Sequence, residues 1–176
     1  KKKNVYEKSL ILRNQGREIN DTFFIHKYRG FNFRMSNIQA AIGYAQMFKI
    51  KKFLNLRKKI FKFYNKVFKK YNFIGLMPDK KNTQNSGWLY TIKIKNINHN
   101  KRNQLIQKLK DKGIEARPAF YPLNKMKPFK KYCKGEYEAS ENVSLKSISL
   151  PSSPFLLKKE LNYITKTFLE EINKIN

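Results

Sequence analysis

The sequence has few of the side chains that build disulfide bridges and metal centres. Its 176 residues include one cysteine, Cys133, and two histidines, His26 and His99, which lie far apart in the chain. A disulfide needs two thiols, and structural zinc sites combine four cysteine or histidine ligands. We therefore expect no disulfide and no metal site, and the lone cysteine favours a reducing, cytoplasmic setting.

Long apolar runs are missing as well. The longest runs are a few residues, far short of the ~20 that a membrane-spanning helix needs. The chain opens with Lys1, Lys2 and Lys3 rather than with a methionine or a signal peptide. From these features we expect no membrane partner, and we expect the chain to be a fragment of a longer protein.

Acidic side chains are scarce, with 12 Asp and Glu against 39 Lys and Arg and a formal net charge of +27. A field of this size can hold a polyanion, so a lysine-rich module that binds nucleic acid is one hypothesis. Only seven of the basic residues are arginines, which bidentate phosphate and base recognition prefers. The lysines are spread along a chain rich in Asn, Ile, Phe and Tyr, all of which A/T-rich codons supply. Genomic background therefore explains the charge better, and we expect no specific nucleic-acid partner.

The lysine-rich background is interrupted between residues 30 and 46, where GFNFRMSNIQAAIGYAQ has one formal charge, Arg34. Ser36 and Gln39 have the spacing of a capping box, which predicts that a helix begins at Ser36. Apolar residues then recur with a helical period to about Tyr71, as one helix or a bent pair. We expect its small, neutral first half to be buried and its basic second half to lie at the surface.

The rest of the chain predicts a small α/β lobe. Residues 88–94 alternate apolar and polar side chains, which is typical of a half-buried strand with Trp88 and Tyr90 in the core. Asn98 and Gly113 suit the two ends of the helix that follows. The remaining expected elements are a strand over 114–120, a helix over 136–146, a strand over 147–151 and a helix over 157–172. Together they favour a mostly antiparallel sheet covered on one face.

Residues just before the predicted cap could bind an anion. Asn32 and Arg34 flank the start of the helix, where free N–H groups and the positive end of the dipole favour a phosphate. His26 could donate to the same anion. The alternative is that Asn32 is a turn residue, Arg34 a surface residue and His26 a surface or packing residue.

A second candidate is Arg117, which lies in the sequence EARPAFYPL between stiffening prolines. Its natural partner is a carboxylate or phosphate, and an internal salt bridge is an equal alternative. Phe120 and Tyr121 beside it could stack on a ligand ring or pack in the core. No nucleophile–base set, carboxylate pair or phosphate-cradling glycine loop can be assembled from the residues present.

Five sequence motifs, in this order along the chain, are similar to the motifs of one known family. The chain resembles the DegT-type nucleotide-sugar aminotransferases, which depend on pyridoxal 5′-phosphate. The motifs are LRNQGR (12–17), GFNFRMSNIQAAIGYAQ (30–46), WLY (88–90), GIEARPAFYPL (113–123) and SLPS (149–152).

The resemblance implies an α/β fold of the aspartate-aminotransferase type (fold type I), with a large cofactor-binding lobe and a small C-terminal lobe. It also implies a homodimer with active sites between the subunits. By the same resemblance, residues 1–47 would complete the large lobe, residues 48–71 would form a connecting helix, and residues 72–176 would form the small lobe.

Residue roles follow from the same likeness. Asn32 would reach across the dimer to the cofactor phosphate in the neighbouring subunit, and Arg34 would help to bind the cofactor or the substrate. Arg117, His26 and Tyr121 would bind substrate. Many relatives carry a histidine where this chain has Asn124, which puts any substrate contact there in doubt. The catalytic lysine that forms a Schiff base with the cofactor would lie upstream of Lys1, so we expect no catalytic residue in this chain and no activity from it alone.

The implied reaction passes an amino group from a donor, glutamate, to a nucleotide-linked keto sugar in polysaccharide biosynthesis. Two alternatives within the family stay open. One is a dehydratase branch, in which histidine replaces the lysine. The other is a non-catalytic relative that keeps only the dimer interface.

Overall fold

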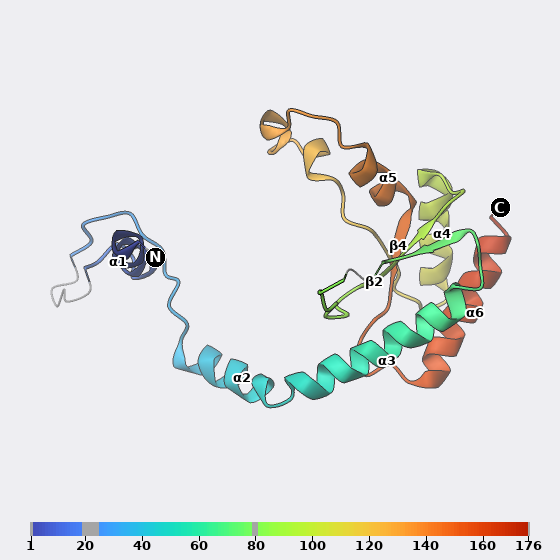
Figure 1. Ribbon diagram of the computed structural model, residues 1–176, viewed down its shortest axis with the longest axis horizontal. Helices are drawn as coiled ribbons and strands as arrows, with labels where there is room; N and C mark the ends of the chain where they lie inside the picture. Colours follow the sequence, from blue (N-terminus) through green and yellow to red (C-terminus); the bar gives the residue numbers. More distant parts are fainter. Residues whose placement is uncertain (1, 19–24, 79–80, 176) are drawn as a thin grey trace. The chain divides into compact units, whose positions relative to one another are not determined.

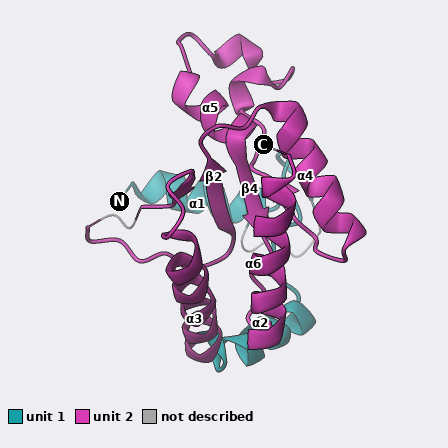
Figure 2. Cartoon of the chain, turned by 90° about the vertical axis from the view of Figure 1, so that its right-hand side faces the viewer, with its two compact units in different colours: residues 1–50 teal, residues 51–176 magenta. Residues whose placement is uncertain are grey.

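The computed structural model describes residues 2–18, 25–78 and 81–175. The chain forms two compact units, residues 1–50 and residues 51–176, which Figure 2 colours separately. The first unit contains α1 (Lys3–Arg13) and α2 (Asn37–Met47). The second contains a four-stranded sheet with its helices (Figure 1).

Helix α2 begins where the sequence predicts. The Ser36 hydroxyl accepts a hydrogen bond from the Gln39 backbone N–H at 3.3 Å, and the Gln39 side chain accepts one from the Ser36 N–H at 2.9 Å. This reciprocal pair is the capping box expected from the spacing of Ser36 and Gln39, and it satisfies two N–H groups of the first turn.

The long helical pattern is a pair of helices rather than one. Helix α2 ends at Met47, and α3 (Ile50–Phe68) follows after a short turn. Within this single chain α2 has no buried residue, and the exposed fractions of Ile38 and Ile42 are 74% and 60%, so its expected burial against another subunit or lobe stays a prediction. The described part of the first unit holds one other helix, α1, and no sheet, so no layer covers the apolar side of α2.

The sheet of the second unit has the order β1-β2-β4-β3, and all its strand pairs are antiparallel. Its strands are β1 (Ile74–Leu76), β2 (Tyr90–Ile94), β3 (Arg117–Pro118) and β4 (Ser147–Leu150). Its other elements are the helices α4 (His99–Asp111), α5 (Glu138–Lys146) and α6 (Lys158–Asn173) and the short 3-10 helices η1 (Leu123–Lys125) and η2 (Lys130–Tyr132).

Local capping signals predicted α4 correctly. The Asn98 side chain accepts a hydrogen bond from the Lys101 N–H at 2.9 Å, and Gly113 has a φ of +74°, the left-handed conformation that ends many helices. The strand expected over 114–120 is reduced to Arg117 and Pro118. Proline has no N–H to donate to a ladder, which limits this edge strand.

The core lies on the face of the sheet that α3, α4 and α6 cover. Tyr90, Ile92 and Ile94 of β2 point into this core and are almost fully buried. Tyr64 of α3 stacks on Tyr90 with ring centroids 4.5 Å apart. The Tyr64 hydroxyl donates to the Pro151 carbonyl at 2.8 Å, and burial raises the pKa of both tyrosines above their usual value.

Trp88 does not belong to this core, contrary to the sequence prediction. Its side chain is 61% exposed. Strand pairing begins at Tyr90, which lies opposite Leu150, so the alternation that buries Tyr90 does not extend back to Trp88.

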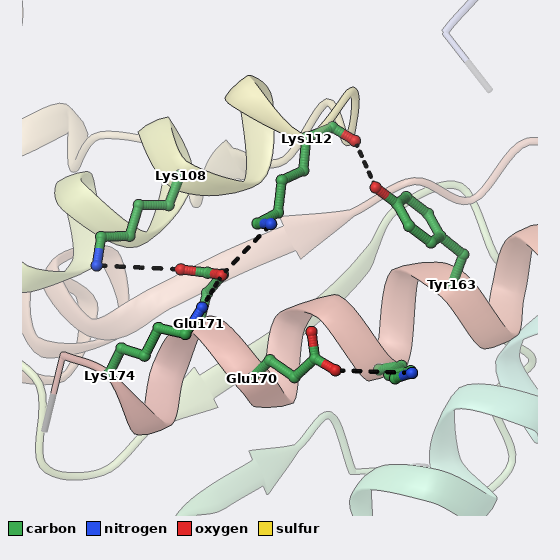
Figure 3. Close-up of polar contacts among 7 residues, drawn as sticks. Lys108, Lys112, Tyr163, Glu170, Glu171 and Lys174 are labelled. Carbon is green, nitrogen blue, oxygen red and sulfur yellow. Dashed lines mark hydrogen bonds and ion pairs between the residues drawn. The ribbon is translucent and has the colours of Figure 1, made fainter.

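A buried carboxylate joins α6 to α4 (Figure 3). Glu171 is 3% exposed, and Lys108, Lys112 and Lys174 surround its carboxylate. The hydrogen bond from Lys174, with N–O distance 2.7 Å, is the main cause that holds the pKa of Glu171 below its usual value. Beside it, the Tyr163 hydroxyl donates to the Lys112 carbonyl at 3.0 Å, which is a second link between the two helices.

Candidate functional site

In the first unit, two backbone segments cross at a pair of glycines. A Cβ atom at Gly30 would lie 2.1 Å from the Gly16 nitrogen, and one at Gly16 would lie 1.8 Å from the Tyr28 carbonyl oxygen. Gly16 also has a φ of +81°, which favours glycine. This crossing explains physically why LRNQGR and GFNFR each contain a glycine.

The crossing pins residues 30–34 against the end of α1. The Phe31 N–H donates to the Leu12 carbonyl at 2.7 Å, the Gln15 N–H donates to the Phe31 carbonyl at 3.0 Å, and Asn14 and Asn32 form an antiparallel bridge. Because side chains alternate along an extended segment, Asn32 points away from the side that carries the stacked rings of Phe31 and Phe33. The backbone that carries Asn32 is therefore fixed by hydrogen bonds on both sides.

Three predicted site residues meet the same turn. The Arg34 guanidinium donates to the Asn14 side-chain oxygen at 3.3 Å, and His26 Nδ1 lies 2.8 Å from the Gln15 carbonyl oxygen. The Asn32 amide is exposed and makes no hydrogen bond to another described residue. The structure thus brings His26, Asn32 and Arg34 together around the turn at residues 14–16.

This arrangement offers hydrogen-bond donors of the kind that bind anions. The amide of Asn32 and the guanidinium of Arg34 are donors, and both precede the first turn of α2, where the N–H groups of Asn37 and Ile38 have no intrahelical partner. The donor set is uncharged or positive. It therefore fits the phosphate of a cofactor, and we call residues 30–36 the phosphate loop.

The second unit holds a cavity of about 620 Å³ on the face of the sheet opposite the core. The β2 and β4 strands contribute hydroxyls to it, because Thr91 and Ser149 lie on the side of the sheet away from Ile92 and Ile148. The residues that matter for its chemistry are Trp88, Thr91, Arg117, Phe120, Ser144 and Ser149. We call this space the sheet cavity.

Arg117 is the single charged residue among the described residues that line the sheet cavity. It forms an ion pair with Glu115 at 2.5 Å, and the side chains of Arg117 and Glu115 are 70% and 75% exposed. The internal salt bridge considered from sequence therefore exists. An ion pair this exposed contributes little stability, so a ligand anion can replace Glu115 at small cost.

Two aromatic rings stand beside Arg117. Trp88 and Phe120 stack with centroids 6.1 Å apart and an interplanar angle of 28°, and both rings are largely exposed. The Ser152 hydroxyl donates to the Trp88 carbonyl at 2.8 Å, which holds the backbone that carries the indole. Exposed, stacked rings beside a cation suit a ligand with a planar ring and a negative group.

Tyr121 and Asn124 lie outside the sheet cavity. Tyr121 follows Phe120, but its side chain is exposed and does not line that cavity. The Asn124 amide donates to Glu141 at 2.7 Å in a separate cavity of about 650 Å³. Hydrogen bonds from Lys125 and then from Asn124 hold the pKa of Glu141 below its usual value.

Sequence reasoning missed the hydroxyls of the sheet cavity and placed Trp88 in the core. A signal for Thr91 was present, because alternation along β2 places it on the face opposite Tyr90 and Ile92. No comparable signal marks Ser144, whose position depends on how α5 packs on β2.

The described residues contain no group of three or more His, Cys, Asp or Glu that could hold a metal ion. None of the described helices combines the length and the apolar character that a transmembrane segment requires.

Comparison with known proteins links these features to one family. The sequence pattern of the DegT/DnrJ/EryC1/StrS aminotransferase family matches residues 1–169. The GDP-perosamine synthase of Escherichia coli O157:H7 is 30% identical over 169 residues, which cover 96% of this chain and 44% of that protein. The chain thus spans less than half the length of this relative.

Solved structures agree with the fold. The PLP form of Spr1654 from Streptococcus pneumoniae matches with a TM-score of 0.86 and 24% identity, covering 98% of this chain and 44% of that chain. Helicobacter pylori PseC, an aminotransferase involved in the biosynthesis of pseudoaminic acid, matches with a TM-score of 0.85 and 22% identity, covering 98% and 47%. These likenesses confirm the expected α/β fold of fold type I. The chain belongs to the DegT/DnrJ/EryC1/StrS aminotransferase family.

Proposed function

We propose that this chain is part of a pyridoxal-phosphate-dependent aminotransferase that aminates a nucleotide-linked keto sugar in glycan biosynthesis. The observation that carries the proposal is the family match over residues 1–169, which includes both the phosphate loop and the sheet cavity. The names of the E. coli relative and of PseC support a sugar substrate, and the PLP form of Spr1654 supports the cofactor.

The phosphate loop fits the phosphate of the cofactor. Asn32 would donate its amide N–H groups to a phosphate oxygen, and Arg34, oriented by Asn14, would add a positive charge. When bound, the pyridine ring of the cofactor supplies the electron sink that amino-group transfer requires. The backbone crossing at Gly16 and Gly30 fixes the backbone of Asn32, so little backbone entropy is lost when the phosphate binds.

The sheet cavity is the proposed site of the nucleotide-linked sugar. Arg117 would exchange Glu115 for a phosphate of the substrate, and the rings of Trp88 and Phe120 offer a surface for a base. Tyr121 and His26 remain proposed substrate residues. Tyr121 has an exposed phenol ring that could contact substrate. On His26, the ring nitrogen that could contact substrate is Nε2, because Nδ1 lies next to the Gln15 carbonyl oxygen.

Further parts of the proposal concern the whole protein. Glutamate is the proposed amino donor, and the protein is proposed to be a cytoplasmic homodimer in which a second copy covers the exposed apolar side of α2. The lysine that bonds to the cofactor would come from outside residues 1–176, so this chain alone would not transaminate. The proposed lobes are residues 1–47, 48–71 and 72–176, and the division into units at residue 50 is compatible with them.

Amination can be tested on the full-length protein that contains this chain. We expect glutamate-dependent conversion of a GDP- or UDP-linked 4-keto sugar to the amino sugar, followed by mass spectrometry. Formation of a dehydrated sugar instead would favour the dehydratase alternative. No reaction and no cofactor absorbance would favour the non-catalytic one.

The role of Asn32 can be tested separately by cofactor affinity. Replacing Asn32 with alanine removes a hydrogen bond to a charged group, which is worth about 1.5–3 kcal/mol, so we expect the Kd for pyridoxal phosphate to rise about 10- to 100-fold. Asn55→Ala, at an exposed position of α3, is the matched control. Equal affinities of the two variants would contradict the assignment of Asn32.

A further inference from the structure

Arg102 is a buried cation that the proposed function does not yet use. It lies in α4 with 4% of its side chain exposed. Its Nη1 donates to the carbonyl oxygens of Ser144 at 3.1 Å and Ser147 at 3.3 Å. The guanidinium of Arg102 therefore joins α4 to the point where α5 ends and β4 begins.

The charge of Arg102 has no acidic partner among the described residues, because its polar contacts there are the two carbonyls. Its Nε is buried and makes no hydrogen bond. Burial lowers the pKa of Arg102 below its usual value, yet an arginine in a protein keeps its proton at neutral pH. Burying a charge without an acidic partner costs free energy. If the only role of Arg102 were to cap the Ser144 and Ser147 carbonyls, a neutral side chain would do so at a lower free-energy cost.

One of the two carbonyls, that of Ser144, belongs to the negative end of a helix that lines the sheet cavity, and the other, that of Ser147, directly follows that helix end. Ser144 lies in the last turn of α5, and the side of α5 formed by Ser140, Val143 and Ser144 lines the cavity. The carbonyl end of a helix carries a partial negative charge, which repels an anion nearby. A fixed cation on these carbonyls offsets that repulsion.

We infer that Arg102 is a positioning residue whose buried charge neutralises the carbonyl end of α5 and so makes the sheet cavity favourable to a phosphate-bearing ligand. This inference rests on the proposed function, which assigns the nucleotide-linked substrate to that cavity. Arg102 acts through α5, whereas Arg117 is the residue that would contact the phosphate. The described lining of the cavity contains Arg117 and no acidic residue, so no lining carboxylate opposes the effect of Arg102.

Two variants separate the charge of Arg102 from its hydrogen bonds. Arg102→Gln removes the charge and leaves an uncharged amide donor on a side chain two bonds shorter, whereas Arg102→Lys keeps both a donor and the charge. Lys110→Gln is the matched control, because it removes one charge from an exposed position of the same helix. The readout is the affinity of the full-length protein for GDP and guanosine, and for UDP and uridine, measured by calorimetry.

We expect Arg102→Gln to weaken binding of the preferred nucleoside diphosphate about tenfold and to leave the corresponding nucleoside within about threefold. Arg102→Lys and Lys110→Gln should both keep the parent's ratio of diphosphate to nucleoside affinity. An equal loss of diphosphate and nucleoside in the glutamine variant would overturn the inference, because a structural cap alone would weaken both.

Other outcomes are also decisive. If Arg102→Gln does not fold, Arg102→Met, an uncharged side chain suited to a buried position, replaces it: a tenfold fall in the diphosphate-to-nucleoside ratio supports the inference, and a ratio within threefold of the parent overturns it. If the parent protein binds neither GDP nor UDP, the proposed function has failed and the inference that rests on it falls too. Diphosphate binding by the parent with an unchanged ratio in the glutamine variant overturns the inference alone.

Discussion

The crossing of the two backbone segments at Gly16 and Gly30 allows a direct test by substitution. In Gly30→Ala, the new Cβ would lie 2.1 Å from the Gly16 nitrogen, 2.5 Å from the Gln15 carbonyl carbon and 2.8 Å from the Gly16 Cα. All three atoms belong to the backbone, so no side chain can rotate away. The two segments must separate to make room for the methyl group.

The cost of that separation can be worked out from the hydrogen bonds across the crossing. Four backbone hydrogen bonds join the segments, donated by the N–H groups of Phe31, Gln15, Phe33 and Tyr28 with N–O distances of 2.7, 3.0, 3.1 and 3.2 Å. Each is worth about 0.5–1.5 kcal/mol net, so losing all four costs about 2–6 kcal/mol of local stability. Such a loss predicts that hydrogen exchange of these amides becomes ~30-fold faster or more.

Gly43→Ala is the matched control, because a Cβ at Gly43 would meet no atom within 4 Å. Gly43 lies inside α2, where alanine is favoured over glycine by about 0.5–1 kcal/mol, so exchange near residue 43 should slow. Unchanged exchange of the Phe31 and Gln15 amides in Gly30→Ala would refute the view that close backbone approach requires glycine there. Because the phosphate loop moves with Phe31, the same variant should also bind pyridoxal phosphate more weakly.

Two other predictions concern the second unit. Glu171→Gln should lower the melting temperature at neutral pH more than Glu170→Gln, because Glu171 is buried among three lysines whereas Glu170 has one exposed partner, Lys166. The folded pKa of Glu171 is depressed, so its contribution is present above the unfolded pKa of about 4.3 and is lost as pH falls through the folded pKa. A difference between the two variants that persists at pH 2 would contradict this linkage. Ile92→Ala should cost about 2–5 kcal/mol in a denaturant titration, since Ile92 is fully buried, whereas Ile38→Ala on the exposed side of α2 should cost less than about 1 kcal/mol in this chain. Similar costs would show that the apolar side of α2 is covered after all.

Sequence reasoning was most successful where structure depends on neighbours in the chain. Ser36, Asn98 and Gly113 mark helix ends through contacts that reach only a few residues, so spacing alone predicted them. It was wrong for Trp88, whose burial depends on where the pairing of β2 with β4 begins. The small, neutral character of α2 indicates a packed helix, but nothing in the described part of its own unit packs on it, so its packing partner stays a prediction.

The residues of the candidate site also fall into two groups, those that local sequence patterns predicted and those that they did not. Asn32, Arg34 and His26 were predicted as donors near one helix start, and the structure brings them to one turn. Arg102 was not predicted, because an arginine within a lysine-rich helix is most often a solvated side chain. Its burial follows from where α5 ends relative to α4, which no local pattern encodes.

Helix α5 has one further consequence, because it forms a wall of two separate cavities. Glu141 lines the cavity that contains Asn124, whereas Ser140, Val143 and Ser144 line the sheet cavity. A shift of this nine-residue helix would therefore change the lining of both cavities. Under the proposed assignment of the substrate to the sheet cavity, substitutions that release Glu141 from Lys125 and Asn124 should change which ligands that cavity accepts while leaving Arg117 in place.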